Sequence, residues 1–277
     1  SEGLSLQVGQ VGSAGTPFVD VVVVVDESGS MFFEQQFLQT FIPTLDSELI
    51  VRGIGDGQFG INQFGLVGFG GGTSGGIDHE PGHSHPVGPG GACFGSSAEF
   101  ANAATTLLLN GFFEDGYDGI DFGLANCPPR PNAAKLYILV TDEDRDILTA
   151  SLTFNSMLAA LTTEQVTLHG ILDINILDNT NTVGLAIAND GTVFIADGAG
   201  GFTLGTGGTV TSFEPTMVQD YVNLVFATNG LAGDLNQLRL GGVTEQSFSK
   251  ALITGIVSGL QLPTPVASND ISNDPVF

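Results

Sequence analysis

The sequence is short of basic side chains. Its 277 residues contain two lysines and four arginines against thirty aspartates and glutamates, which gives a formal net charge of -24. We expect no nucleic-acid partner, because neutralising phosphates requires clustered Lys and Arg, and the same shortage disfavours an anionic membrane surface. Cations are the expected counterparts of this charge, bound in a site or held diffusely, and adaptation to a saline habitat is the alternative explanation.

Long apolar runs and cysteines are also scarce. No apolar stretch approaches the roughly 20 residues that cross a bilayer, so we expect no membrane span. The only cysteines, Cys93 and Cys127, are expected to form a disulfide if the protein is extracellular, and two free buried thiols are the alternative. The sequence starts at Ser1 without an initiator Met, which fits a secreted protein that has lost its signal peptide; a trimmed chain would look the same.

Apolar strands alternate with segments of helical period along most of the chain. Residues 17–26, PFVDVVVVVD, predict a buried strand because they are rich in β-branched residues. The other predicted elements are helix 33–49, strand 59–70, helix 97–110, helix 119–126, strand 135–142, helix 148–162, extended segment 165–177, helix 216–230, edge strand 231–238 and helix 244–260. This alternation predicts an α/β fold: a Rossmann-like, doubly wound, mainly parallel sheet with helices on both faces.

Several segments stand outside this rhythm. One domain over residues 17–260 accounts for the alternation, preceded by a strand-like arm at 1–16 and followed by an extended tail at 261–277. Inside the domain, the glycine- and proline-rich segment 70–91 is expected to be an inserted loop. The Asn-Asp-Gly sequence between two apolar stretches predicts an inserted β-hairpin at 181–198.

Acidic and hydroxyl side chains follow two of the predicted buried strands. Asp26, Ser28 and Ser30 come after the first, and Asp142 comes after the strand 135–142. Ligands bind beyond the carboxyl ends of strands in open parallel sheets, and two close carboxylates need a proton or a cation between them. Oxygen-only donors suit Mg²⁺, Ca²⁺ or Mn²⁺, so we predict a divalent cation site with positions left open. A helix N-cap is the alternative explanation of the first turn alone.

At these residues the chain resembles the von Willebrand factor A (VWA) family. The family's Asp-x-Ser-x-Ser signature is present from Asp26 to Ser30, and LYILVTD places Asp142 at the metal-site aspartate of a later strand. LVFATNGLAGDLNQL is similar to the family's helix, ATGG and short edge strand, so the resemblance covers most of 17–260. It implies a VWA fold with a metal-ion-dependent adhesion site and a protein partner that supplies Asp or Glu to Mg²⁺ or Ca²⁺ held by Asp26, Ser28, Ser30 and Asp142.

The chain departs from the family pattern in one loop. The family supplies a threonine before a middle helix, often in Gly-Gly-Thr-Asp, whereas here EDGYDGIDFGL puts Tyr117 at that position and Asp118 after it. Either Asp115 or Asp118 approaches the metal, or the fifth ligand is lost. An added carboxylate would favour Ca²⁺ over Mg²⁺.

Two other polar groups could bind cations. The histidines of HEPGHSHP have a spacing that could hold Zn²⁺ or Cu²⁺ together with Glu80, but a solvated loop is favoured because no HExxH helix is present; they are His79, His83 and His85. The acids that follow Asp142 are expected to form a solvated loop, with a second cation site as the alternative; they are Glu143, Asp144 and Asp146.

These observations favour a secreted, non-enzymatic adhesion or extracellular-matrix protein that binds an acidic partner through a divalent cation. The alternative is a self-assembling filament or matrix subunit, joined to copies of itself through the arm at 1–16 or an exposed strand edge. A metal-dependent hydrolase is disfavoured, because only distant histidines or surplus acids could serve as its general base.

Overall fold

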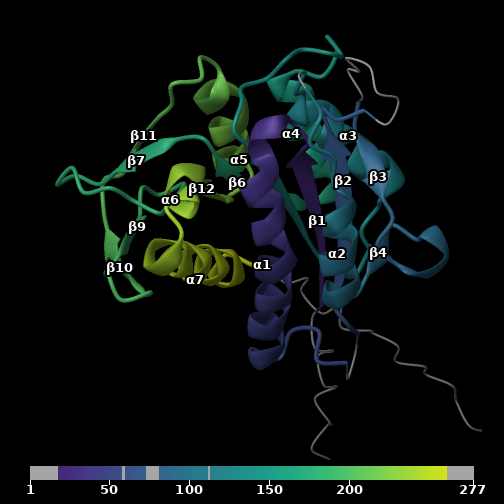
Figure 1. Cartoon of the computed structure of the whole chain (residues 1–277), viewed down its shortest axis with the longest axis horizontal. Helices are drawn as coiled ribbons and strands as arrows, with labels where there is room; N and C mark the ends of the chain where they lie inside the picture. The colour runs from purple at the N-terminus through teal and green to yellow at the C-terminus, as the bar shows by residue number, and fades with distance from the viewer. Residues whose placement is uncertain (1–17, 58–59, 73–80, 112, 261–277) are drawn as a thin grey trace, which may run out of the picture.

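A computed structural model describes residues 18–57, 60–72, 81–111 and 113–260, and within them the chain forms a central ten-stranded sheet (Figure 1). The five central strands, in the order β12-β6-β5-β1-β2, are all parallel to their neighbours. Their bounds are β1 Val19–Asp26, β2 Gln63–Phe69, β5 Ala134–Thr141, β6 Val166–Leu172 and β12 Leu231–Asp234. The predicted fold class, a mainly parallel doubly wound sheet, is confirmed.

Antiparallel strands complete both sides of this sheet. β3 and β4 pair with β2, and β8, β9 and β10 continue the sheet beyond β12, while β7 and β11 form a separate two-stranded sheet. The bounds are β3 His83–His85, β4 Phe94–Gly95, β7 Asn175–Leu177, β8 Ala186–Ala188, β9 Val193–Ala196, β10 Phe202–Gly205 and β11 Thr209–Thr211.

The predicted hairpin within 181–198 is present as β8 and β9, and it belongs to the main sheet because β8 also pairs with β12. The prediction that 231–238 form an edge strand is wrong. β12 covers only the first half of that range and lies between β6 and β8, and the chain then turns into a short helix. The hairpin takes the edge position and pairs the polar backbone groups that an edge strand would expose.

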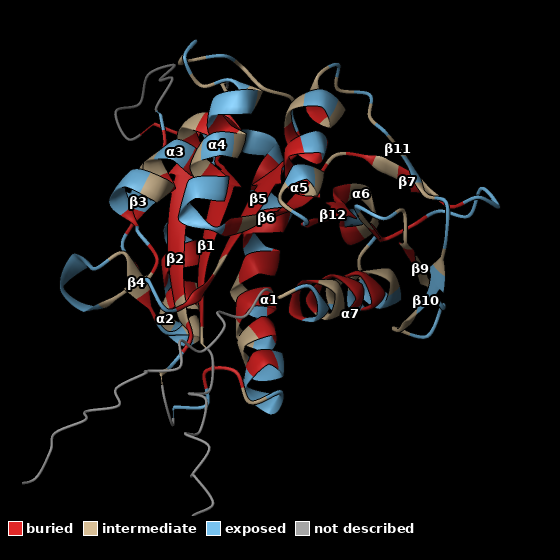
Figure 2. Ribbon diagram, turned by 180° about the vertical axis from the view of Figure 1, so that it is seen from behind, coloured by how far each residue is buried: buried red, intermediate tan, exposed pale blue. Residues whose placement is uncertain are grey.

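Helices cover both faces of the sheet, and the middle strands are buried between them (Figure 2). α1, α2, α6 and α7 share one apolar core with the sheet, and α3, α4 and α5 share the other. The helices are α1 Phe32–Val51, α2 Ser97–Ala103, α3 Gly116–Asn126, α4 Phe154–Glu164, α5 Asn223–Ala227, α6 Leu235–Arg239 and α7 Gly242–Ser258. Short turns of other helix types are η1 Gly29–Met31, η2 Pro89–Gly91, η3 Ala104–Thr106 and the π-helical η4 Val218–Val222.

The valine run of β1 explains why the sheet needs two helical layers. Successive side chains of a strand point to opposite faces. Val21, Val23 and Val25 pack into the core with α1 and α7, whereas Val22 and Val24 pack into the core with α3 and α5. Each of these valines is fully buried, which stabilises the fold by roughly 1.5–3 kcal/mol per side chain.

Part of the predicted loop at 70–91 is a strand. β3 pairs antiparallel with β2, and His85 lies opposite Leu66 and is only 8% exposed. The interpretation of these histidines as a solvated loop is therefore wrong for His83 and His85, because strand pairing turns both inward. His79, the arm at 1–16 and the tail at 261–277 lie outside the described residues.

Candidate metal centre

The acidic turn lies where two neighbouring parallel strands end. β1 and β5 are paired in register, with Val25 beside Val140, so Asp26 and Asp142 leave the sheet at the same edge. After β1 the chain enters η1 and then α1, which places the hydroxyls of Ser28 and Ser30 beside the strand end. The carboxyl edge of the sheet thus collects these four oxygen-bearing side chains, as the sequence predicts.

A continuous series of hydrogen bonds joins these side chains. The backbone N–H of Ser28 donates to Asp26 Oδ1 at 2.7 Å, and the hydroxyl of Thr141 donates to Asp26 Oδ2 at 2.8 Å. Ser28 Oγ lies 2.9 Å from Ser30 Oγ, which in turn donates to Asp142 Oδ1 at 3.0 Å. Ser30 is exposed and the other members are buried, so the set is held rigidly by the fold and opens to solvent on one side.

The negative charge of Asp26 is poorly compensated by the protein alone. Burial raises the pKa of Asp26 to about 7, and the charge of Asp142 adds to the rise, although hydrogen bonds from Ser28 and Thr141 oppose it. A carboxylate in such surroundings is stabilised either by a proton or by a cation. A divalent ion bound to the oxygens of Asp26 and Asp142 would take the place of that proton.

Glu114 is an acid of this region that the sequence analysis missed. It is 1% exposed, and burial followed by the charges of Asp26, Glu143 and Asp146 raises its pKa to about 8. Its Oε2 has no hydrogen-bond partner among the residues that the structure describes. The stretch EDGYDG contains Glu114, but the family's threonine corresponds to Tyr117, and the predicted ligands of this loop, Asp115 and Asp118, both follow Glu114.

The two tentative ligands of the middle helix make their contacts elsewhere. The hydroxyl of Tyr117 donates to the carbonyl of Asp220 at 2.7 Å, and its ring packs against Tyr221 with centroids 5.8 Å apart. Asp118 accepts a hydrogen bond from the Thr149 hydroxyl at 3.0 Å. Within the described residues neither side chain is hydrogen-bonded to the four-residue set at the strand ends.

Asp115, the other candidate in that loop, has a structural role in the fold. Its carboxylate caps α3 by accepting from the backbone N–H of Tyr117 at 3.1 Å. Both of its oxygens also accept from the guanidinium of Arg145, at 2.6 and 2.9 Å. Asp115 is fully buried in this bidentate pair, and its charge is compensated by Arg145.

The acids after Asp142 form a partly exposed loop tied to backbone groups. Asp144 Oδ2 accepts from the N–H of Thr216 at 3.1 Å, and Asp146 Oδ2 accepts from the N–H of Glu114 at 3.3 Å. These bonds hold the loop near the strand ends, where its charges act on Glu114.

Arg239 brings a positive charge to the rim of the site. Its Nη2 donates to Asp142 Oδ2 at 2.6 Å and its Nε donates to Glu34 Oε1 at 2.6 Å. Glu34 is fully buried, and the Arg239 side chain is 30% exposed. Any cation bound by Asp142 therefore shares that carboxylate with the guanidinium.

A second cluster lies on the other side of the same turn. Glu27, which directly follows Asp26, is fully buried and has Oε2 2.8 Å from His83 Nε2 and Oε1 2.9 Å from His85 Nε2. Burial alone would raise the pKa of Glu27, but the contacts with His83 and His85 hold it at about 2. These three side chains are a candidate metal site, since their ligand atoms lie within 4.8 Å of one another.

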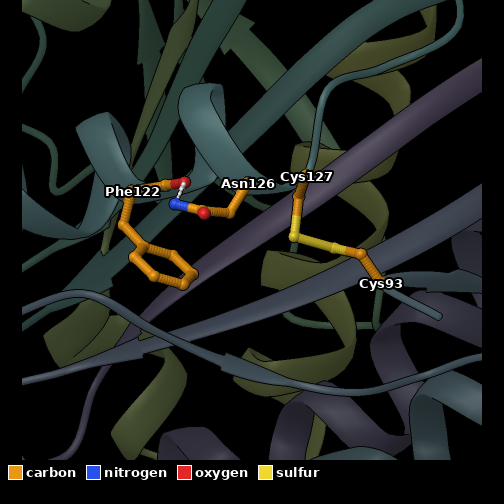
Figure 3. Close-up of a disulfide and its surroundings, with 4 residues drawn as sticks. All are labelled: Cys93, Phe122, Asn126 and Cys127. Atoms are coloured by element: carbon orange, nitrogen blue, oxygen red, sulfur yellow. Dashed lines mark hydrogen bonds between the residues drawn. A yellow bond between two sulfur atoms is a disulfide. The ribbon is translucent and has the colours of Figure 1, made fainter. Parts of the chain in front are cut away.

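The two cysteines form a disulfide, with Cα atoms 5.7 Å apart (Figure 3). Cys93 directly precedes β4 and Cys127 directly follows α3, where the Asn126 side chain donates to the carbonyl of Phe122 at 3.0 Å. The disulfide therefore links the start of β4, at one side of the sheet, to the C-terminal end of α3. A loop of this length corresponds to about 4 kcal/mol in the chain-entropy model.

The doubly wound sheet, the Asp-x-Ser-x-Ser sequence after its first strand and the aspartate after the adjacent strand are the features on which the resemblance to the VWA family rests. The solved structures that match part of this chain include VWA domains. Neither a protein-family model nor a curated protein matches the sequence. None of the described helices has both the length and the apolar character needed to cross a membrane.

Three of these structures show the extent of the likeness. Proximal thread matrix protein 1 from the mussel byssus is 18% identical over 57% of this chain and 38% of that chain, with a TM-score of 0.40. A von Willebrand factor type A protein from Catenulispora acidiphila is 18% identical over 56% of this chain and 33% of that one, with a TM-score of 0.39. BatB from Bacteroides thetaiotaomicron, a conserved hypothetical protein, is 12% identical over 87% and 98% of the two chains, with a TM-score of 0.45.

The likeness concerns the fold and says nothing of individual residues. The match to the first two proteins covers less than half of their length. One structure of the mussel protein has zinc in its metal-ion-dependent adhesion site (MIDAS) motif, which is a property of that protein.

Proposed function

We propose that this protein binds a divalent cation through Asp26, Ser28, Ser30 and Asp142 and uses the ion to hold an acidic group of a protein partner. The observation that supports this proposal is the hydrogen-bonded series of oxygens that joins these side chains at the carboxyl edge of the sheet. Two carboxylates and two hydroxyls leave coordination positions for water, and a carboxylate from a partner can replace that water.

Oxygen-only donors favour Mg²⁺ or Ca²⁺ over softer metals. Glu114 adds a buried carboxylate close enough to Asp26 for their charges to interact, and its Oε2 lacks a hydrogen-bond partner among the described residues. Ca²⁺ accepts six to eight oxygen ligands in flexible geometry, whereas Mg²⁺ requires a near-ideal octahedron. We therefore propose Ca²⁺ as the preferred ion of this acid-rich site.

Apolar side chains beside the site suit a protein partner. Phe32 and Phe33 directly follow η1 and are 46% and 67% exposed, with their rings 5.5 Å apart. Aromatic side chains are enriched at protein interfaces, and burial of these two would add apolar contact around a central carboxylate–cation bond. Phe33 begins the predicted helix 33–49 but is exposed, and the apolar face of α1 is buried only from Phe37 onward.

The disulfide supports a secreted, extracellular protein, because such bonds form and persist in oxidising compartments. We propose a binding role without catalysis. The two histidines closest to the acidic turn are both in contact with Glu27, so neither is placed as a general base for the ion at Asp26.

Calorimetry on the full chain tests the proposal. Ca²⁺ and Mg²⁺ are titrated into chelator-treated wild type, Asp26→Ala, Asp142→Asn and, as a matched charge control, Asp121→Asn on the exposed side of α3. We expect saturable binding that the first two variants lose and the control keeps, with cation-dependent retention on a polyglutamate-coated surface following the same order. Equal binding by wild type and Asp26→Ala would exclude this site.

A self-assembling subunit is the second candidate, favoured by the outer strand of the described sheet. Among the strands that the structure describes, β10 pairs only with β9, and Leu204 on β10 is 63% exposed. Such an edge can accept a strand from a second copy. Light scattering and electron microscopy of wild type and Leu204→Lys test this: assembly that the substitution leaves unchanged would rule out this edge.

A further inference from the structure

We propose that Glu27, His83 and His85 form a second metal site, specific for a transition-metal ion such as Zn²⁺ and separate from the oxygen-only site at Asp26. Two imidazoles and a carboxylate are a ligand set that Zn²⁺ prefers, whereas Ca²⁺ and Mg²⁺ prefer oxygen. Three protein ligands also leave a fourth position of a tetrahedral ion open.

Strand geometry brings the two imidazoles together. His83 and His85 are two residues apart on β3, so their side chains lie on the same face, and their ring centroids are 5.1 Å apart. Glu27 reaches them from the end of β1, because its backbone N–H is bonded to Phe69 at the end of β2. The ligand atoms are close enough for one ion to bind all three after small rotations of the side chains.

Hydrogen bonds on the far side of each ring fix the nitrogen that carries the proton, and the other nitrogen faces Glu27. His83 Nδ1 lies 3.2 Å from the carbonyl of Pro81, which can only accept, so this nitrogen carries the proton. His85 Nδ1 lies 3.0 Å from Thr106 Oγ1, whose own proton is donated to the carbonyl of Ala103 at 2.7 Å. Nδ1 of His85 is therefore also the donor. Metal-binding histidines are oriented in this way by their second nitrogen.

The Nε2 atom of each ring then faces the Glu27 carboxylate, at 2.8 Å for His83 and 2.9 Å for His85. Two lone pairs aimed at a buried carboxylate repel it, and two protonated rings in contact repel each other. With one ring protonated, that ring pairs with Glu27 but the Nε2 lone pair of the other ring still faces the carboxylate. Glu27 Oε2 and His85 Nε2 also make no hydrogen bond of good geometry within the described part of the chain, despite the short distances in the cluster. A cation bound between the three ligand atoms would contact Glu27, His83 and His85 at once.

Two glycines leave room for this arrangement. A Cβ on Gly68 of β2 would lie 2.5 Å from Glu27 Oε2 and 2.9 Å from His85 Nε2, and a Cβ on Gly71 would lie 2.9 Å from Glu27 Oε2. Neither glycine has a positive φ, so close approach of the cluster is the reason for the missing side chain. The space that any other residue would fill is the space where the three ligands converge.

Cobalt substitution of the full chain tests the site. Chelator-treated protein is titrated with Zn²⁺ by calorimetry and with Co²⁺ by visible spectroscopy, in wild type, His83→Gln, His85→Ala and Asp142→Asn. We expect one Zn²⁺ per chain and ligand-field bands typical of tetrahedral Co²⁺ in wild type and Asp142→Asn. The histidine variants should bind Zn²⁺ more weakly by more than about 100-fold while keeping their Ca²⁺ binding.

Three results would overturn the proposal: no Zn²⁺ bound by wild type, Zn²⁺ binding unchanged in His83→Gln, or Zn²⁺ binding lost in Asp142→Asn and kept in the histidine variants. The last would place zinc in the oxygen site. If His85→Ala does not fold, His83→Gln decides alone, because the His83 side chain is 22% exposed and its replacement disturbs the core little. Ca²⁺ and Zn²⁺ binding are measured separately, so a negative result for the site at Asp26 and a negative result for the site at Glu27 can be told apart.

Discussion

Replacing Asp26 by asparagine removes the negative charge of this side chain and keeps its size and shape. In the metal-free protein, burial raises the pKa of Asp26 from 3.8 to about 7. The folded state holds the Asp26 proton more tightly than the unfolded state does. The contribution of Asp26 to the free energy of unfolding is therefore greatest below pH 4 and is lost as the pH rises to about 7. The full loss is about 4 kcal/mol at higher pH.

The asparagine variant has no charge at this position and avoids this loss. One of its two side-chain positions is an NH2 group, which cannot accept the hydrogen bond that Ser28 N–H or the Thr141 hydroxyl donates to Asp26. One unsatisfied donor costs about 1–3 kcal/mol. At pH 8 the metal-free variant should therefore be about 1–3 kcal/mol more stable than wild type, and at pH 5, where the charge costs only about 1.6 kcal/mol, the two should be nearly equal.

Urea unfolding in chelator at pH 5 and pH 8 measures these differences, with Asp121→Asn as the control for removal of an exposed charge. Added Ca²⁺ at about 100 times its Kd should stabilise wild type by about 2.7 kcal/mol, or roughly 5–11 °C in Tm, and leave the variant unchanged. A variant that is destabilised equally at both pH values would refute the conclusion that the buried charge of Asp26 is costly without a cation.

Three other substitutions test separate parts of the structure. Arg239→Gln should raise Ca²⁺ affinity, because it frees a carboxylate oxygen of Asp142. The same substitution should lower the free energy of unfolding in urea by about 3–5 kcal/mol, because it leaves the buried Glu34 unpaired. Unchanged Ca²⁺ affinity would argue against a Ca²⁺ ion and Arg239 sharing that oxygen. Joint replacement of Cys93 and Cys127 by alanine should cost about 4 kcal/mol, and reductant should affect wild type but not the variant in the same assay. Tyr221→Phe should cost about 1–3 kcal/mol by removing the hydroxyl that accepts the first backbone N–H of α3, and a neutral result in thermal unfolding would show that water replaces it.

Features set by local pattern could be predicted from the sequence. The unbroken valines of β1 predict burial on both faces, and strand ends marked by Asp26 and Asp142 predict that these acids meet, because parallel strands share a carboxyl edge. The separation of 34 residues between the cysteines was compatible with pairing, and the disulfide is present. Each of these inferences needs only the periodicity of the chain and the rule for parallel sheets.

Contacts set by tertiary packing could not be predicted in the same way. Arg239 lies 97 residues from Asp142 in sequence, and no local pattern shows that α6 points its last side chain at that site. His83 and His85 have the two-residue spacing of a strand face, but the surrounding glycines and prolines favoured a loop, and pairing with β2 outweighed that local preference. The sequence of β12 resembles an edge strand, but β8 of the hairpin pairs with its outer side, which no local pattern indicates.

The central position of β1 has a mechanical consequence. A force applied along β1 strains both of its rows of parallel hydrogen bonds together in shear, because β1 is paired with β2 on one side and β5 on the other along its length. The acidic turn at the carboxyl end of β1 would therefore stay assembled until the central strand slips past both neighbours.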